Sequence, residues 1–135
     1  MTYRTIATAN AIASVVFGLA ALLVPNALAS LYALTFDNAA VYAARLLGGS
    51  YVGYAIASFL TRDTSDPATR RAIAAANVFA WATGCVVTTF AQAQGLANAF
   101  GWATGALELL FAIAWIRAYV AERAGRSEPQ GALGR

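Results

Sequence analysis

The sequence contains no histidine and no lysine, and it has a single cysteine among its 135 residues. Without histidine, the chain lacks the commonest general base and the usual protein ligand of zinc and haem. Cys85 has no second cysteine with which to form an intrachain disulfide. We therefore predict no enzymatic activity, no catalytic residue, no cofactor and no metal site.

Charge is also scarce. Only 11% of the residues are charged and 60% are hydrophobic, whereas soluble domains carry about 25% charged residues. The apolar residues form long runs, which is typical of a polytopic membrane protein. All nine basic residues are arginine, and no basic run with interleaved aromatic residues exists. We therefore do not expect nucleic acid as a partner.

The apolar runs divide into four segments of about 20 residues, the length needed to cross a hydrocarbon layer of about 30 Å. Asp66 before Pro67 is typical of a helix N-cap, and residues 26–38 can hold a short interfacial helix. We predict an all-α integral membrane protein that forms one four-helix bundle over residues 1–135. Its spans are expected at about 5–24, 39–60, 72–93 and 97–119.

The arginines predict the orientation of these spans. Apart from Arg45, which lies inside the second span, they lie before the first span, between the second and third, and after the core of the fourth, while the two opposite connections contain none. The positive-inside rule therefore places both termini, the 61–71 loop and the tail at 120–135 in the cytoplasm. Together with the abundance of alanine and the lack of lysine, this predicts a multi-pass protein of the bacterial cytoplasmic membrane.

Two features at the start of the chain bear on its organisation. The sequence ALAS at residues 27–30 resembles a signal-peptidase site, but the apolar segment is longer than a usual signal core, so we expect a retained helix. The sequence IATAN at residues 6–10 matches IAAAN at residues 73–77. This spacing of 67 residues favours two parallel two-helix repeats.

Two spans carry faces of small residues that can pack closely against another helix. In the fourth span, residues that recur at steps of three and four share one face. In the second span, the face follows steps of four. The first face contains Gly101, Gly105, Glu108, Ala112 and Trp115, and the second contains Arg45, Gly49, Gly53 and Ala57.

Arg45 and Glu108 are the two ionisable residues well inside the predicted spans. Each costs about 2.5–3.5 kcal/mol at a helix centre on insertion scales. Three interpretations are open. The two side chains form a structural ion pair, Arg45 alone extends to the outer surface, or Glu108 exchanges a proton or cation in a transport path with Arg45 beside it.

Asn10 and Asn77 fall at similar depths in the first and third spans. Asparagine side chains can hydrogen-bond across helices within a membrane. We expect these two residues to hold helices together rather than to contact a substrate.

The stretches ARLLGGSYVGYAIASFLTRD and GLANAFGWATGALELLFAIAW, at residues 44–63 and 95–115, resemble small four-span bacterial membrane proteins of unknown function, loosely of the DoxX-like group. The resemblance implies a fold and no chemistry. This chain differs from those proteins at Glu108, where the resemblance implies an aliphatic or aromatic residue. We therefore do not expect the other proteins of the group to share any role that Glu108 has here.

These features lead to one leading functional hypothesis and two alternatives. The small-residue faces and short loops favour a membrane accessory or scaffold protein that packs against itself, as a homo-oligomer, or against a larger membrane complex. The first alternative is a small oligomeric transporter or channel that uses Glu108 and Arg45. The second is a lipid-interacting protein. All three have the lipid bilayer as a partner.

Overall fold

A computed structural model describes residues 2–124, and within that range all regular secondary structure is helical. The prediction of an all-α protein is confirmed. The predicted tail begins inside the last helix, and residues 125–135 of that tail lie outside the described residues. The five helices are α1 (Tyr3–Leu23), α2 (Pro25–Leu31), α3 (Asn38–Thr61), α4 (Pro67–Ala93) and α5 (Ala99–Ala124).

Local signals in the sequence fix several helix ends. The Asp66 carboxylate accepts hydrogen bonds from the backbone N–H groups of Ala68 and Thr69, and Pro67 occupies the first turn of α4, as predicted. Asp37 caps α3 in the same manner through the Ala40 N–H. Gly95, with φ of +68°, supplies the left-handed conformation in the turn that follows α4.

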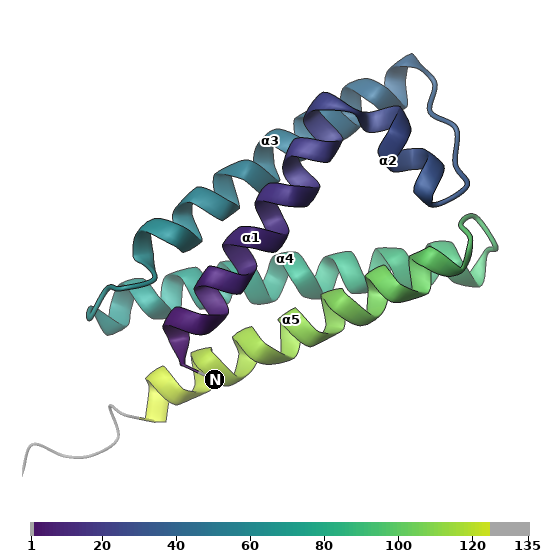
Figure 1. Cartoon of the computed structure of the whole chain (residues 1–135). Helices are drawn as coiled ribbons and strands as arrows, with labels where there is room; N and C mark the ends of the chain where they lie inside the picture. The colour runs from purple at the N-terminus through teal and green to yellow at the C-terminus, as the bar shows by residue number, and fades with distance from the viewer. Residues whose placement is uncertain (1, 125–135) are drawn as a thin grey trace, which may run out of the picture.

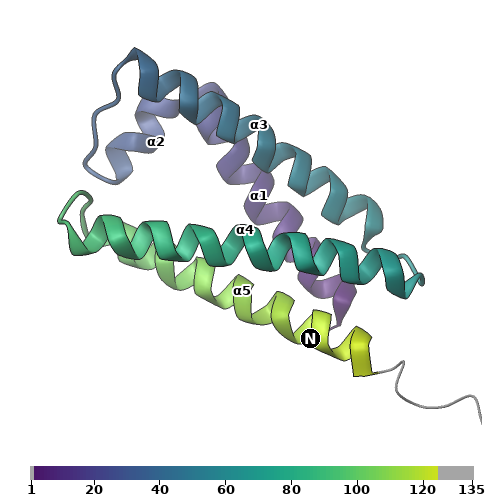
Figure 2. The same ribbon diagram turned by 180° about the vertical axis from the view of Figure 1, so that it is seen from behind.

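The helices are arranged as two antiparallel hairpins (Figure 1). The first hairpin consists of α1 and α3, the second consists of α4 and α5, and most contacts between helices lie within one hairpin or the other. Figures 1 and 2 show the hairpins meeting at the end that holds the N-terminus and separating toward the end that holds α2. We call these the joined end and the open end.

Aromatic and charged contacts tie the two hairpins at the joined end. The ring of Tyr3 packs edge to face against Trp115, with 5.8 Å between centroids, and the Arg70 guanidinium lies 5.1 Å from the Tyr3 ring centroid. Arg70 also forms an ion pair with Glu122 at 3.1 Å. These contacts connect α1, α4 and α5 at one end of the molecule.

The close approach within the first hairpin corrects the glycine face predicted for the second span. Gly49 and Gly53 are exposed, and a Cβ atom at either would meet nothing within 4 Å. The close contact instead involves Gly48, where a Cβ atom would lie 2.7 Å from the carbonyl oxygen of Gly18. The buried face of α3 contains Gly48, Ala55 and Ser58. The steps of four therefore predicted a different and more exposed side of the helix, on which Ala57 is only partly buried.

Three of the described helices, α1, α4 and α5, are long and apolar enough to cross a membrane. Helix α3 has 24 residues, but arginine, glycine, serine and tyrosine interrupt its apolar run. Many large apolar side chains on the helices face outward and are exposed. Such surfaces are typical of helices surrounded by lipid.

Candidate functional site

Asn10 is the centre of a buried hydrogen-bond network between the hairpins. Its side chain is fully buried. The amide nitrogen donates to the Ser58 hydroxyl at 2.8 Å, and the amide oxygen accepts from the indole N–H groups of Trp81 at 2.6 Å and Trp115 at 3.1 Å. One side chain of α1 therefore connects α3, α4 and α5.

Asn77 has a different role, although it occupies the matching position in the repeated sequence. It is buried, and its amide nitrogen donates to the carbonyl oxygen of Ile73 in its own helix at 2.9 Å. The partners of Asn10 are Ser58 and two tryptophans, and no motif in the sequence indicated them. The indole N–H is a donor that requires a partner when buried, which is the one signal that could have suggested this network.

Glu108 is buried in the middle of the molecule, and one of its carboxylate oxygens has no hydrogen-bond partner. The residue is only 6% exposed, and among the described residues Oε2 is the one buried side-chain polar atom without a partner. The Thr88 hydroxyl lies within hydrogen-bonding reach of the carboxyl group. A Cβ atom at Gly84 would lie 2.8 Å from Oε1, so the absence of a side chain there makes room for the carboxylate.

The predicted ion pair between Glu108 and Arg45 is not present. Arg45 is exposed, and the salt bridges between described side chains involve other residues. The reason is the pairing of the helices: α3 packs along α1, whereas α5 packs along α4. At the open end these pairs are apart, so α3 does not deliver Arg45 to the carboxylate on α5.

The face predicted for the fourth span lies inside the molecule. Glu108, Ala112 and Trp115 are buried. Gly101 is also buried, and a Cβ atom there would collide with the Gln92 amide. Gly105 lies beside Thr88, whose methyl group would be 3.5 Å from an added Cβ atom. This face therefore packs α5 against α4 and directs Glu108 between the hairpins.

A cavity of about 250 Å³ lies between the separated hairpins and has Glu108 in its wall. We call it the interhelical cavity. Its lining comes from all five helices and from residues 32–36, and is mainly apolar. Its polar groups are the carboxylate of Glu108 and the hydroxyls of Tyr32, Tyr51, Thr88 and Thr104. Much of the remaining wall consists of the aromatic rings of Phe17, Phe36 and Trp81.

The segment after α2 closes the interhelical cavity at the open end. The hydroxyls of Tyr32 and Thr104 are hydrogen-bonded at 2.9 Å, and the Tyr32 ring packs edge to face against Phe100. Asn98 in the α4–α5 turn donates its backbone N–H to the Tyr32 carbonyl and its amide to the Leu31 carbonyl. The short helix expected within residues 26–38 is present as α2 and helps to bridge the two hairpins.

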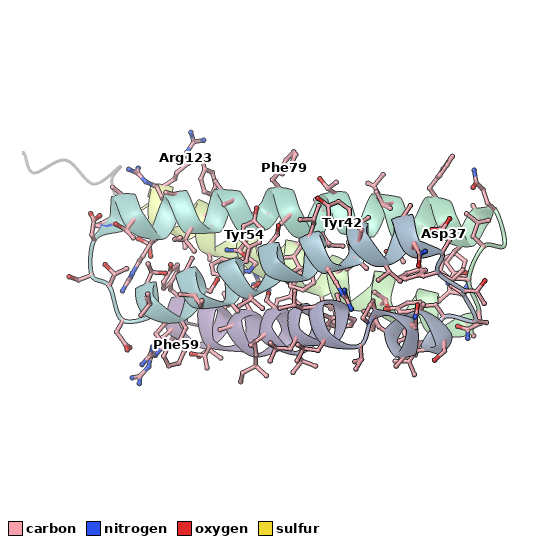
Figure 3. All side chains as sticks on the ribbon, turned by 90° about the horizontal axis from the view of Figure 1, so that it is seen from above. Asp37, Tyr42, Tyr54, Phe59, Phe79 and Arg123 are labelled. Atoms are coloured by element: carbon pink, nitrogen blue, oxygen red, sulfur yellow. The ribbon has the colours of Figure 1, made fainter. Side chains whose placement is uncertain are left out.

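A second cavity, of about 410 Å³, lies between α3 and α4 and also reaches Glu108. It shares Tyr51, Thr88 and Glu108 with the interhelical cavity. Tyr54 on α3 and Phe79 on α4, both labelled in Figure 3, line it and are exposed at 40% and 74%. We call it the lateral opening, because it connects the buried carboxylate with the outer surface of the helices.

The chemistry available at this site is that of one carboxylate and several hydroxyls among apolar and aromatic side chains. Over residues 2–124, no group of three or more histidine, cysteine, aspartate or glutamate residues could hold a metal ion. The geometry therefore suits binding of a small molecule through a few polar contacts.

Comparison with known protein families gives a match over most of the chain. The family model described as Domain of unknown function (DUF8292) matches residues 8–121. No curated protein and no solved structure matches the chain. The DoxX-like resemblance is not tested by these findings and stays a prediction.

Proposed function

The chain belongs to the DUF8292 family, for which no activity is defined, and from its geometry we propose that it is a membrane-embedded protein that binds a small, largely apolar molecule in the interhelical cavity. The bound molecule donates a hydrogen bond to Glu108. The observation that carries this proposal is the free Oε2 atom of Glu108, which is buried beside the cavity. A buried acceptor without a partner is costly, and a donor on a ligand would satisfy it.

The lateral opening supports entry of the ligand from the lipid. It lies between α3 and α4 and leads to the same carboxylate. Its exposed lining combines large apolar and aromatic side chains with the hydroxyls of Ser50 and Thr83. A molecule dissolved in the bilayer would reach Glu108 through this opening without crossing water. The proposed function is therefore that of a lipid-interacting protein rather than that of an enzyme.

The packing of the joined end favours binding over conduction. Between the interhelical cavity and the joined end lie the Asn10 network and the fully buried ring of Trp115. The hydrogen bonds of Trp81 and Trp115 to Asn10 close this route. A channel or transporter would have to break this network in each cycle.

The membrane topology belongs to the same proposal. We take α3 as a fourth span beside the three apolar helices, because it packs along α1 and has sufficient length. Both termini then lie in the cytoplasm of a bacterial cell. Single cysteines introduced into a Cys85→Ala background at Ser65 and Asn38 should react with an impermeant reagent from opposite sides of the membrane. Reaction from the same side would contradict four spans.

The binding proposal can be tested with 4-phenylbutan-1-ol, which combines an apolar body with a hydroxyl donor. In phosphatidylcholine nanodiscs, we expect this probe to raise the melting temperature of the protein and to change its tryptophan fluorescence, since Trp81 lines the cavity. Glu108→Leu should abolish both effects. Glu122→Gln, which alters an acid at the joined end, is the matched control and should retain them. Equal responses in all three proteins, or none in any, would contradict the proposal.

A second candidate function, that of an accessory protein, is favoured by the outward face of α3. Gly49 and Gly53 are exposed, and a Cβ atom added at either would meet nothing within 4 Å beyond its own turn of helix among the described residues, which leaves room for the close approach of another membrane helix. Gly49→Leu and Gly53→Leu should then reduce copurification with a partner or a second copy, with no effect on binding of the alcohol. Unchanged copurification in both variants would contradict this candidate.

A further inference from the structure

We infer that the molecule taken by the Glu108 site is a lipophilic organic ammonium ion, in which a protonated amine donates to the free carboxylate oxygen. The inference rests on the proposed function and narrows the ligand to one chemical class. It follows from three properties of the cavity walls: their charge, their aromatic content and their shape.

The first property is the absence of a balancing cation. Among residues 2–124, Glu108 is the one carboxylic acid in the lining of the interhelical cavity and the lateral opening, and no arginine of this range lines either. The arginine expected to pair with it, Arg45, is exposed on α3. A carboxylate that is removed from water needs a cation and hydrogen-bond donors. A bound ammonium group provides both, whereas a neutral alcohol provides the donor alone.

The second property is the aromatic content of the wall of the interhelical cavity. Phe17, Tyr32, Phe36, Tyr51 and Trp81 all contribute to the wall of the interhelical cavity. Cations are attracted to the negative faces of such rings, and the attraction is larger in a desolvated site. An anion would meet the carboxylate without any compensating positive group. The walls therefore favour cations over neutral molecules and exclude anions.

The third property is the continuity between the two cavities. They share Tyr51 and Thr88 in addition to Glu108, so one molecule can extend through both. A charged head at Glu108 leaves its apolar tail in the lateral opening, where Phe79 and Val87 form part of the wall. This shape suits a linear amphiphile with one charged end that is present in the bilayer.

The test compares two probes of the same shape, 4-phenylbutylammonium chloride and 4-phenylbutan-1-ol, by titration in phosphatidylcholine nanodiscs at neutral pH. We expect the ammonium ion to bind the unaltered protein at least about tenfold more tightly than the alcohol. In Glu108→Gln, which keeps the shape and an acceptor but removes the charge, the two affinities should become equal. Glu122→Gln should keep the tenfold preference, which controls for charge at the protein surface.

The outcomes separate this inference from the proposed function. If the alcohol binds the unaltered protein as tightly as the ammonium ion, the inference is overturned and the proposed function stands. If neither probe binds, both are overturned. A preference for the ammonium ion that persists in Glu108→Gln would also overturn the inference, because the charge of Glu108 would then not be its cause. The first comparison needs only the unaltered protein and does not depend on how the variants fold.

Discussion

Two polar side chains are buried between the hairpins, Asn10 toward the joined end and Glu108 toward the open end, and they differ in whether their polar atoms have hydrogen-bond partners. Asn10 makes three hydrogen bonds to Ser58, Trp81 and Trp115. Glu108 keeps one oxygen without a partner beside a cavity of about 250 Å³. At the joined end the hairpins are in contact, whereas at the open end they have separated (Figures 1 and 2).

The difference separates a structural polar group from a candidate binding group. A buried polar residue with all its hydrogen bonds fixes the arrangement of its neighbours, and its loss leaves them unsatisfied. A buried polar residue without a hydrogen-bond partner lowers the stability of the unliganded protein. Such a residue is a candidate binding group, because a ligand can supply the missing hydrogen bond. We therefore expect apolar substitutions of Asn10 to lower the free energy of unfolding and those of Glu108 to leave it unchanged or raise it.

The largest effect is expected for Asn10→Leu. It leaves the indole N–H groups of Trp81 and Trp115 buried without an acceptor, which should lower the free energy of unfolding by about 2–3 kcal/mol. Asn77→Leu is the matched control, because Asn77 is equally buried but bonds only within its own helix, and it should cost less than about 1 kcal/mol. Unfolding in mixed detergent micelles measures both. Equal losses would remove the distinction between the two asparagines.

A smaller effect is expected within the first hairpin. Gly48→Ala places a methyl group 2.7 Å from the Gly18 carbonyl oxygen and from the Leu22 nitrogen, so the helices must move apart at a cost of about 1–3 kcal/mol. Gly49→Ala, one residue away in open space, should change stability by less than about 0.5 kcal/mol or raise it slightly through helix propensity. Thermal unfolding of the two variants gives the comparison, and the reverse order would show that the predicted glycine face was right.

At the open end, Tyr32→Phe removes the hydroxyl that bonds to Thr104. The loss should be about 0.5–1.5 kcal/mol, and hydrogen exchange of residues 32–37 should become faster, because this segment is connected to α5 through that bond. Tyr42→Phe changes an exposed tyrosine on α3 and should have no effect on either quantity. Unchanged exchange in Tyr32→Phe would mean that the segment is held by its backbone bonds to Asn98 alone.

The smallest effect is the coupling between Arg45 and Glu108. Because Arg45 is exposed and makes no salt bridge with Glu108, the effects of Arg45→Gln and Glu108→Gln should add to within about 0.5 kcal/mol. A double-mutant cycle on unfolding free energies measures this. A coupling above about 1 kcal/mol would mean that the ion pair forms in the membrane and that the carboxylate is not free.

The sequence predicted the helices far better than the contacts between them. The start of α4 follows from the predicted cap Asp66, and the approximate extent of α3 follows from the length of its apolar run, both of which are local properties. The cap at Asp37 is also a local signal, although it was not part of the prediction. The inward face of α5 also followed from spacing, because its small and polar residues recur at helical steps around Glu108.

The parts of the site that the sequence did not reveal depend on which helices pair. Arg45 was expected near Glu108 because both lie in spans with the same direction, but α3 packs on α1 and carries its arginine away. The close contact of α3 involves Gly48 rather than Gly49, because small residues lie on more than one side of this helix and their spacing alone does not show which side meets α1. The interhelical cavity arises because the two hairpins separate. This separation cannot be predicted from the sequence pattern of any single helix.

The claim that Glu108 is a binding group rather than a structural one is tested most directly by the free energy of unfolding of Glu108→Met without added ligand. Methionine has similar length and no polar oxygen to leave unsatisfied. We expect stability to be unchanged or to rise by about 1–2 kcal/mol, because the substitution removes a buried acceptor that has no partner. A fall of about 2 kcal/mol or more, as expected for Asn10→Leu, would contradict the account and make Glu108 part of the framework.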